Sequence, residues 1–152
     1  MTVAEPSARV MHVITGLDTG GAETQLALLV GARKEAGAED IVVSLIPGGV
    51  VRQRLKNAGV TVHDLGMQRG RPSLTGLLRL RSLILRTKPR IVQSWMYHAD
   101  LLGGLAAKFA GVPVIAWGIR NSNLSFASSK FSTLMVMRAC GLISRWIPRK
   151  IL

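Results

Sequence analysis

The chain has 152 residues, of which 48% are hydrophobic and 18% are charged, a composition typical of one globular domain rather than of a disordered chain. Its formal net charge is +12, which favours anionic partners such as phosphorylated ligands, nucleic acid or an anionic lipid surface. The longest uncharged runs, 41–51 and 109–119, are too short to span a bilayer, and the first residues lack the pattern of a secretion signal.

The first half of the chain alternates between apolar runs and helical patterns. Residues 9–15 form an apolar run that predicts a strand, and 21–36 carry apolar side chains three to four residues apart, as a helix does. The β-branched run 40–46 predicts a second strand, 51–58 a short helix, and 60–65 a third strand.

The same alternation continues in the second half. Residues 73–87 predict a helix whose first residue, a serine, is a suitable N-cap. Residues 90–95 predict a strand, 99–110 a helix and 113–119 a strand, and 128–147 are mostly helical.

This order of elements indicates the fold class. Five strands that alternate with helices through short connections predict an α/β fold, a Rossmann-like parallel sheet flanked by helices. We expect residues 1–8 to be a disordered N-terminus and residues 9–152 to form one domain. Because the chain ends on an apolar pair where another strand would begin, we also expect it to be truncated at its C-terminus.

Ligands of open parallel sheets bind outside the carboxyl ends of the strands, so the residues that follow each strand are the candidates for a site. Three such groups, at 16–21, 96–100 and 120–122, would meet at one edge of the sheet.

A glycine-rich loop follows the first strand. Gly20 at the N-cap and Gly21 at the first helical position would leave backbone N–H groups open to a phosphate. Glu23 would then be able to reach back to the N-cap N–H, as in a capping box. The alternative is an ordinary glycine turn, since an acid at this place opposes a phosphate. The spacing matches neither a Walker A loop nor a GxGxxG loop.

His98 is the candidate for proton chemistry, because it follows the fourth strand and titrates near neutral pH. Asp100 lies near it in the sequence. His12 and His63 fall inside predicted strands, where a structural histidine is the more common case. With one cysteine, Cys140, and three separated histidines, no metal site is indicated.

The second half of the chain also contains arginines and tryptophans that could contribute to a site. Arg120 could clamp a phosphate or carboxylate, or only cap the end of a strand. Trp95 and Trp117 are expected to pack rather than stack on a ligand. In the basic segment 69–90 we expect the leucines to pack on the sheet and the arginines to face solvent. The alternative is contact with anionic lipid; the scarce aromatics disfavour nucleic acid.

Two stretches, VMHVITGLDTGGAETQLALLV and PRIVQSWMYHADLLGGLAAKFAGVPVIAWGIRNSN, resemble the N-terminal half of bacterial glycosyltransferases of family 4. The resemblance covers nearly the whole chain and implies one half of the GT-B architecture, in which two Rossmann-like domains face a cleft. By position, Gly20 and Gly21 match the loop that approaches the donor diphosphate, and His98 matches the catalytic histidine near the transferred sugar. The residues expected on the acceptor or cleft side are Glu23, Asp100, Arg120 and Asn121.

The resemblance further implies transfer of a sugar from a nucleotide sugar to a hydroxyl acceptor, with retention and without a metal or another cofactor. The acceptor would be a glycan or lipid-linked molecule of cell-envelope synthesis. The protein would be cytoplasmic, and it could lie peripherally at the inner face of the membrane. The family's Glu-x7-Glu motif belongs to a second domain that this chain lacks, so we expect the fragment alone to be inactive.

Two other functions remain open on the sequence. A dehydrogenase is disfavoured by the missing GxGxxG loop and by the missing acid after the second strand. A non-catalytic basic module for anionic membranes or nucleic acid predicts salt-sensitive binding without any response to nucleotide sugars.

Overall fold

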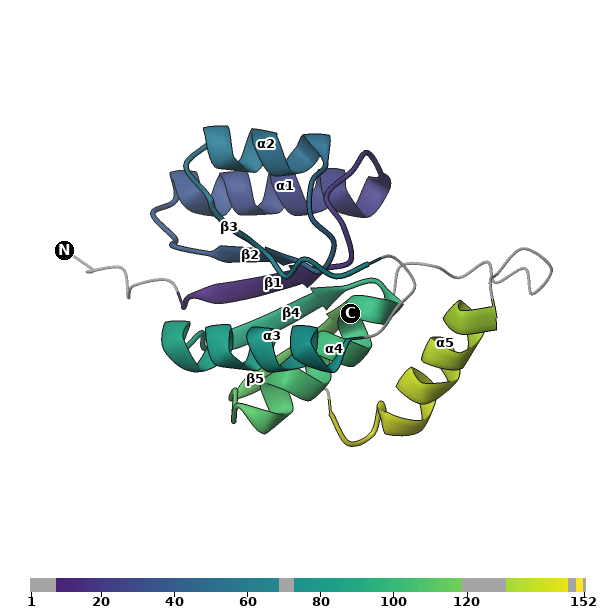
Figure 1. Cartoon of the computed structure of the whole chain (residues 1–152). Helices are drawn as coiled ribbons and strands as arrows, with labels where there is room; N and C mark the ends of the chain where they lie inside the picture. The colour runs from purple at the N-terminus through teal and green to yellow at the C-terminus, as the bar shows by residue number, and fades with distance from the viewer. Residues whose placement is uncertain (1–7, 69–72, 119–130, 148–149, 152) are drawn as a thin grey trace.

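The structure is a computed structural model that describes residues 8–68, 73–118, 131–147 and 150–151 (Figure 1). Within them the elements in chain order are β1 (Val10–Ile14), α1 (Gly21–Glu35), β2 (Ile41–Ser44), α2 (Val50–Asn57), β3 (Thr61–Asp64), α3 (Leu74–Thr87), β4 (Ile91–Trp95), α4 (Tyr97–Phe109), β5 (Val114–Gly118), α5 (Phe131–Ile143) and β6 (Lys150–Ile151).

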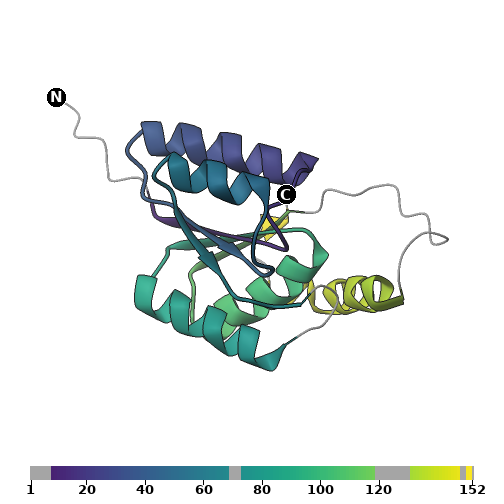
Figure 2. The same cartoon turned by 45° about the horizontal axis from the view of Figure 1, so that its top comes forward.

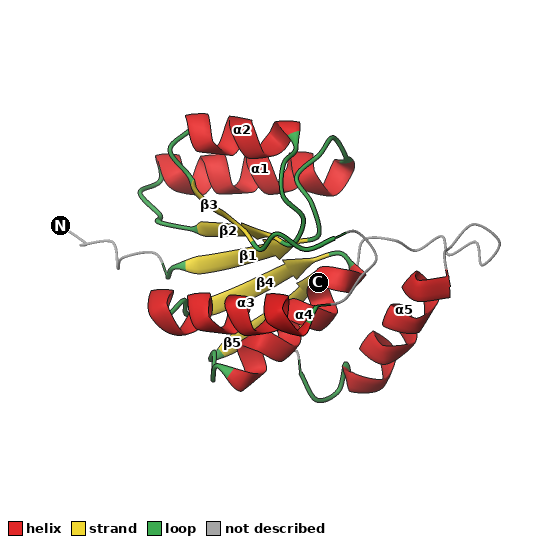
Figure 3. Ribbon diagram, in the orientation of Figure 1, coloured by secondary structure: helices red, strands yellow, loops and turns green. Residues whose placement is uncertain are grey.

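The described strands form one parallel sheet in the order β3-β2-β1-β4-β5-β6. Helices α1 and α2 cover one face, and α3 and α4 cover the other (Figures 1 and 2). Helix α5 packs against α4. The predicted Rossmann-like α/β fold is therefore confirmed, and Figure 3 shows its three layers.

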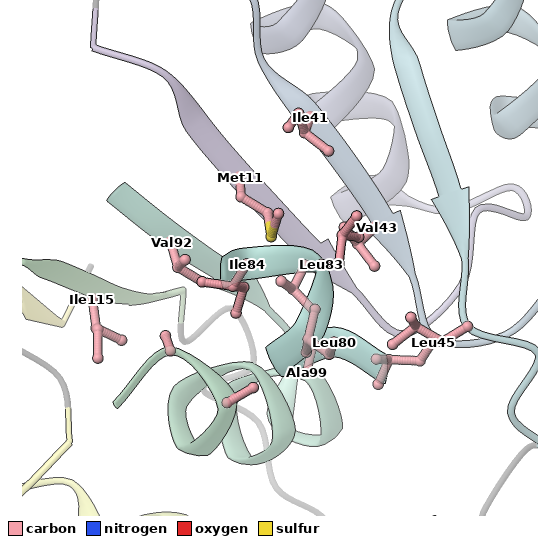
Figure 4. Close-up of a cluster of buried hydrophobic side chains, with 14 of the residues drawn as sticks. Met11, Ile41, Val43, Leu45, Leu80, Leu83, Ile84, Val92, Ala99 and Ile115 are labelled. Carbon is pink, nitrogen blue, oxygen red and sulfur yellow. The ribbon is translucent and has the colours of Figure 1, made fainter. Parts of the chain in front are cut away.

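Each face of the sheet has its own apolar core, which explains why the strands read as nearly unbroken apolar runs. The core under α3 and α4 contains Met11, Val43, Leu80 and Ile84 (Figure 4). The core under α1 and α2 forms around Ile14, Leu17, Leu26, Val30, Val42 and Trp95. Both tryptophans of the central strands are buried, as predicted.

Three elements differ from the sequence prediction. Helix α4 begins at Tyr97 rather than at residue 99, because Met96 is its N-cap and accepts a 2.8 Å hydrogen bond from the N–H of Asp100. Helix α5 ends at Ile143, before the predicted end at residue 147. A short sixth strand, β6, pairs with β5 in addition to the five predicted strands.

Helix α3 begins as predicted, with the Ser73 hydroxyl accepting a 3.2 Å hydrogen bond from the N–H of Gly76. Its leucines do not all pack on the sheet, which corrects the sequence prediction: Leu74, Leu78 and Leu85 are exposed. Among the described residues, no helix is both long enough and apolar enough to cross a membrane.

Candidate functional site

The order of the strands places a switch point between β1 and β4. Strand β1 continues to β2 and β3 on one side, whereas β4 continues to β5 and β6 on the other. The last residues of the two strands, Ile14 and Trp95, are paired, so the loop after β1 and the turn after β4 leave the sheet side by side. The helices that follow them, α1 and α4, lie on opposite faces (Figure 2). Open α/β sheets bind ligands at such a point.

The loop after β1 brings two glycines to this point. Helix α1 begins at Gly21, with Gly20 as its N-cap in an extended conformation, as predicted. The Gly20 carbonyl accepts hydrogen bonds from the N–H (3.0 Å) and the hydroxyl (2.7 Å) of Thr24. The Glu23 carboxylate folds back against Gly20, so that a Cβ at Gly20 would collide with it. The described hydrogen bonds do not include one from Gly20 N–H to Glu23 that would complete the capping box.

The fold itself does not require glycine at two positions of this loop. A Cβ added to Gly16 or Gly21 would meet no atom of the described residues within 4 Å, and neither residue has a positive φ. Alanine at Gly21 would also favour the helix by up to about 1 kcal/mol. Neither backbone conformation nor packing explains these glycines. Glycine does, however, let a ligand approach the backbone closely, because it has no side chain.

Gly49 packs against the loop after β1, a role that the sequence did not predict. Gly49, with φ 100°, packs so closely on the backbone of Leu17 that a Cβ there would collide with the Leu17 carbonyl. Two hydrogen bonds tie the same segments: Val51 N–H donates to Leu17 O (3.0 Å) and Ile46 N–H donates to Thr15 O (3.0 Å). The signal available in the sequence was the glycine pair directly before helix α2.

On the other side of the switch point, His98 lies in the first turn of α4 and is half-buried. Burial lowers its pKa below the ordinary value of 6.5, so the imidazole is neutral at neutral pH. It can then donate one hydrogen bond and accept another. Met96, two residues before His98, has φ 76° and ψ 151°, a conformation that is essentially restricted to glycine. Its side chain is exposed.

Asp100 does not lie where the sequence reading placed it. Its side chain is only 1% exposed and therefore cannot line an acceptor cleft. The Ser94 hydroxyl donates a 2.6 Å hydrogen bond to Asp100 Oδ1, and the backbone N–H of Gly118 donates to the same carboxylate. Burial raises the pKa of Asp100 to about 6, although both hydrogen bonds act in the opposite direction.

The other candidates divide into structural residues and residues outside the described part. Arg120 and Asn121 lie outside the described residues. His12 is buried in β1, where its Nδ1 accepts a 3.3 Å hydrogen bond from the Trp95 indole N–H and its Nε2 lies 3.5 Å from Asp40. His12 therefore has the structural role that was predicted for it. His63 is half-buried in β3.

Sequence comparison finds no matching family model and no matching curated protein, but solved structures share the fold. HepE from Anabaena, in complex with UDP, is 18% identical over 94% of this chain, with a TM-score of 0.69. MurG from Acinetobacter baumannii is 15% identical over 94%, with a TM-score of 0.63. A UDP-N-acetylglucosamine 2-epimerase is 19% identical over 90%, with a TM-score of 0.55. The chain covers only 36%, 40% and 40% of the lengths of these three proteins.

Proposed function

We propose that this chain is the N-terminal, acceptor-side part of a bacterial family 4 glycosyltransferase with the GT-B architecture. The complete enzyme would move a sugar, with retention, from a nucleotide sugar to a hydroxyl of a cell-envelope polysaccharide or glycolipid. Two of the structural neighbours involve UDP: HepE is in complex with UDP, and the epimerase is named for UDP-N-acetylglucosamine. The group that they share is UDP, and we propose a UDP-linked sugar as the donor here.

The observation that carries the proposal is the open N-terminus of α1 at the switch point. Gly21 is exposed at the positive end of the helix, where the backbone N–H groups of the first turn have no partner within the helix, and a Cβ placed on Gly21 would meet no atom of the described residues within 4 Å. A diphosphate placed there would accept hydrogen bonds from these N–H groups. The chain has glycine at this position although alanine would be the better helix former. The Glu23 carboxylate lies against Gly20 and would repel a diphosphate, so we expect its side chain to turn away when the donor binds.

His98 lies in the first turn of α4, directly after the strand that pairs with β1, and its chemistry suits a sugar. A neutral imidazole can hydrogen-bond a hydroxyl of the transferred sugar, or accept the proton that the acceptor hydroxyl loses during transfer. The lowered pKa keeps the imidazole in this neutral form at neutral pH. We keep Arg120 and Asn121 as proposed cleft residues, because they follow β5 in the chain.

We expect the reaction to need neither a metal nor a cofactor besides the nucleotide sugar. The described chain supplies one wall of the proposed cleft, since it covers about two fifths of the neighbours' lengths. These 152 residues should therefore bind a donor weakly and release no UDP on their own.

A membrane location is supported by the outer face of α3. Leu74, Leu78 and Leu85 are exposed on a helix that also carries exposed Arg81 and Arg86. Apolar side chains bordered by arginines suit an anionic bilayer surface, which agrees with a lipid-linked acceptor and a place at the inner face of the membrane. Replacing Leu78 by Ser should weaken sedimentation with phosphatidylglycerol vesicles and leave the stability nearly unchanged.

The test of the donor site is a titration of the ¹⁵N-labelled chain with UDP and with UDP-glucose, followed by NMR. UDP should shift the amide signals of Gly20, Gly21 and His98 and leave those of β3 in place. His98→Ala should weaken the response, whereas His63→Ala, the matched control in β3, should not.

Other outcomes separate the alternatives. Shifts with NADH but not with UDP would support a dehydrogenase. Salt-sensitive binding to vesicles or DNA without any UDP response would support the non-catalytic basic module. Either result would overturn the proposed function.

A further inference from the structure

Two features near His98 are unfavourable for the fold and close to each other in the chain. Met96 has a backbone conformation that only glycine adopts without strain. Asp100, four residues later, is a buried carboxylate without a cationic partner among its described contacts. Packing does not account for Met96, because 40% of its side chain is exposed. Strain and buried charge of this kind persist when the surrounding structure holds them in place, and they gather at functional sites.

The contacts of Asp100 show what is held in place. Its carboxylate accepts hydrogen bonds from Ser94 in β4 and from the N–H of Gly118 at the end of β5. Its own N–H donates to the carbonyl of Met96. One residue thus ties the first turn of α4 to the ends of two strands and to the strained turn that precedes the helix.

A second contact holds the same turn from α5. The Cys140 thiol lies 3.5 Å from the carbonyl of Tyr97, the residue directly before His98. Burial raises the pKa of Cys140 to about 12, so this sulfur stays a protonated donor. The residues on both sides of His98 are therefore held by groups in the protein interior, while His98 itself is half-buried at the switch point.

We infer that Asp100 is a positioning residue that fixes the first turn of α4 through Ser94 and Gly118 and thereby holds His98 opposite the glycine loop. The inference rests on the proposed function of that site and adds a residue to it. An apolar side chain at this position would avoid burying a charge, but it would leave the first turn of α4 attached to β4 and β5 by packing alone. The buried carboxylate therefore lowers the stability of the folded protein, and in return it holds His98 in a fixed position.

The experiment compares Asp100→Asn and Ser94→Ala with the wild-type chain, and uses Asp64→Asn as the control. Asp64 pairs with Arg52 at the end of β3, outside the β1–β4 switch point. Two quantities are measured for each variant: the ring NMR signals of His98, with His12 and His63 as internal references, and the affinity for UDP. Urea unfolding at neutral pH gives the stability in parallel.

Asp100→Asn should shift the His98 ring signals and weaken UDP binding by about tenfold, which corresponds to about 1.4 kcal/mol, while the variant remains at least as stable as the wild type. Ser94→Ala should shift the His98 signals and weaken binding in the same direction. Asp64→Asn should leave both readouts unchanged. Loss of binding without loss of stability is the result that a merely structural role would not produce.

Unmoved His98 signals in both Asp100→Asn and Ser94→Ala would overturn the inference, and so would unchanged UDP affinity of both variants. If Asp100→Asn does not fold, Ser94→Ala decides alone. A wild-type chain that gives no response to UDP would overturn the proposed function, and the His98 signals would then still show whether Asp100 positions that side chain.

Discussion

The buried carboxylate of Asp100 makes a definite prediction about stability and pH. Its pKa is raised from 3.8 to about 6 by burial. At about 1.36 kcal/mol per pKa unit, the ionised carboxylate destabilises the folded state by about 3 kcal/mol at neutral pH. Asparagine has nearly the same shape and can still accept a hydrogen bond from Ser94 or Gly118. Asp100→Asn should therefore make the protein more stable at neutral pH.

The sign follows from proton binding. In the unfolded chain Asp100 loses its proton near pH 3.8, whereas in the folded protein it keeps the proton up to about pH 6. Between these values the folded state binds more protons, so its stability falls as the pH rises. The favourable contribution is fully present below pH 3.8 and lost above pH 6. About 2 kcal/mol of this loss lies between about pH 4.5 and pH 7.5.

Urea unfolding of the wild type and of Asp100→Asn at these two pH values measures the effect. The stability gap in favour of the variant should widen by about 2 kcal/mol from the lower to the higher pH. The lowered pKa of His98 acts in the opposite direction, because it adds stability as the pH rises toward 6.5. Since Asp100→Asn is expected to move His98, the same comparison in a His98→Ala background removes this contribution from both proteins. A gap that stays constant or narrows would refute the reasoning.

Three further predictions concern glycines and a buried ion pair. Gly49→Ala should destabilise the protein by about 2–4 kcal/mol in urea unfolding, because the residue has a positive φ and its Cβ would collide with Leu17; a loss below about 1 kcal/mol would contradict the described packing. Gly21→Ala should keep or raise the stability by up to about 1 kcal/mol and weaken UDP binding measured by NMR; unchanged binding would remove the argument for a ligand at α1. Asp40 has its pKa held well below 3.8 by hydrogen bonds that include those from His12 and Arg33, despite its burial, so its stabilising contribution is present above pH 3.8 and lost as the pH falls below that value. Asp40→Asn should flatten acid unfolding followed by circular dichroism in that range, and an unchanged acid transition would count against the ion pair.

Much of the fold could be predicted because the strands are buried on both faces. A strand covered by helices on both sides must be apolar throughout, and β1, β2 and β5 show this directly in their residues. The start of α1 was also readable, since two glycines followed by an acid mark a helix N-terminus. The start of α4 was not readable, because a methionine in a conformation reserved for glycine gives no signal in the sequence.

That missed helix start explains the misplaced Asp100. If α4 began at residue 99, His98 would precede the helix, and its side chain could share one cleft with that of Asp100 at the start of the helix. With the helix beginning at Tyr97, the two residues are two positions apart on a helix, about 200° around its axis, and cannot face the same way. Asp100 is buried in the interior, whereas His98 is half-buried. The same helical geometry explains the exposed leucines of α3: Leu74, Leu78 and Leu85 lie on one stripe, and the buried Leu80 and Leu83 lie on the opposite one.

The strand order also has a consequence for how the chain is made. Strand β1 leaves the ribosome before the other described strands, yet it lies inside the sheet between β2 and β4. While the segment from β1 to α3 is being synthesised, β1 can pair with β2 on one side only. Its other edge, the apolar run Val10–Ile14, has no pairing strand until β4 has emerged. During that interval the nascent chain presents an open strand edge of the kind that recruits other chains, so a pause in translation between α3 and β4 should promote aggregation.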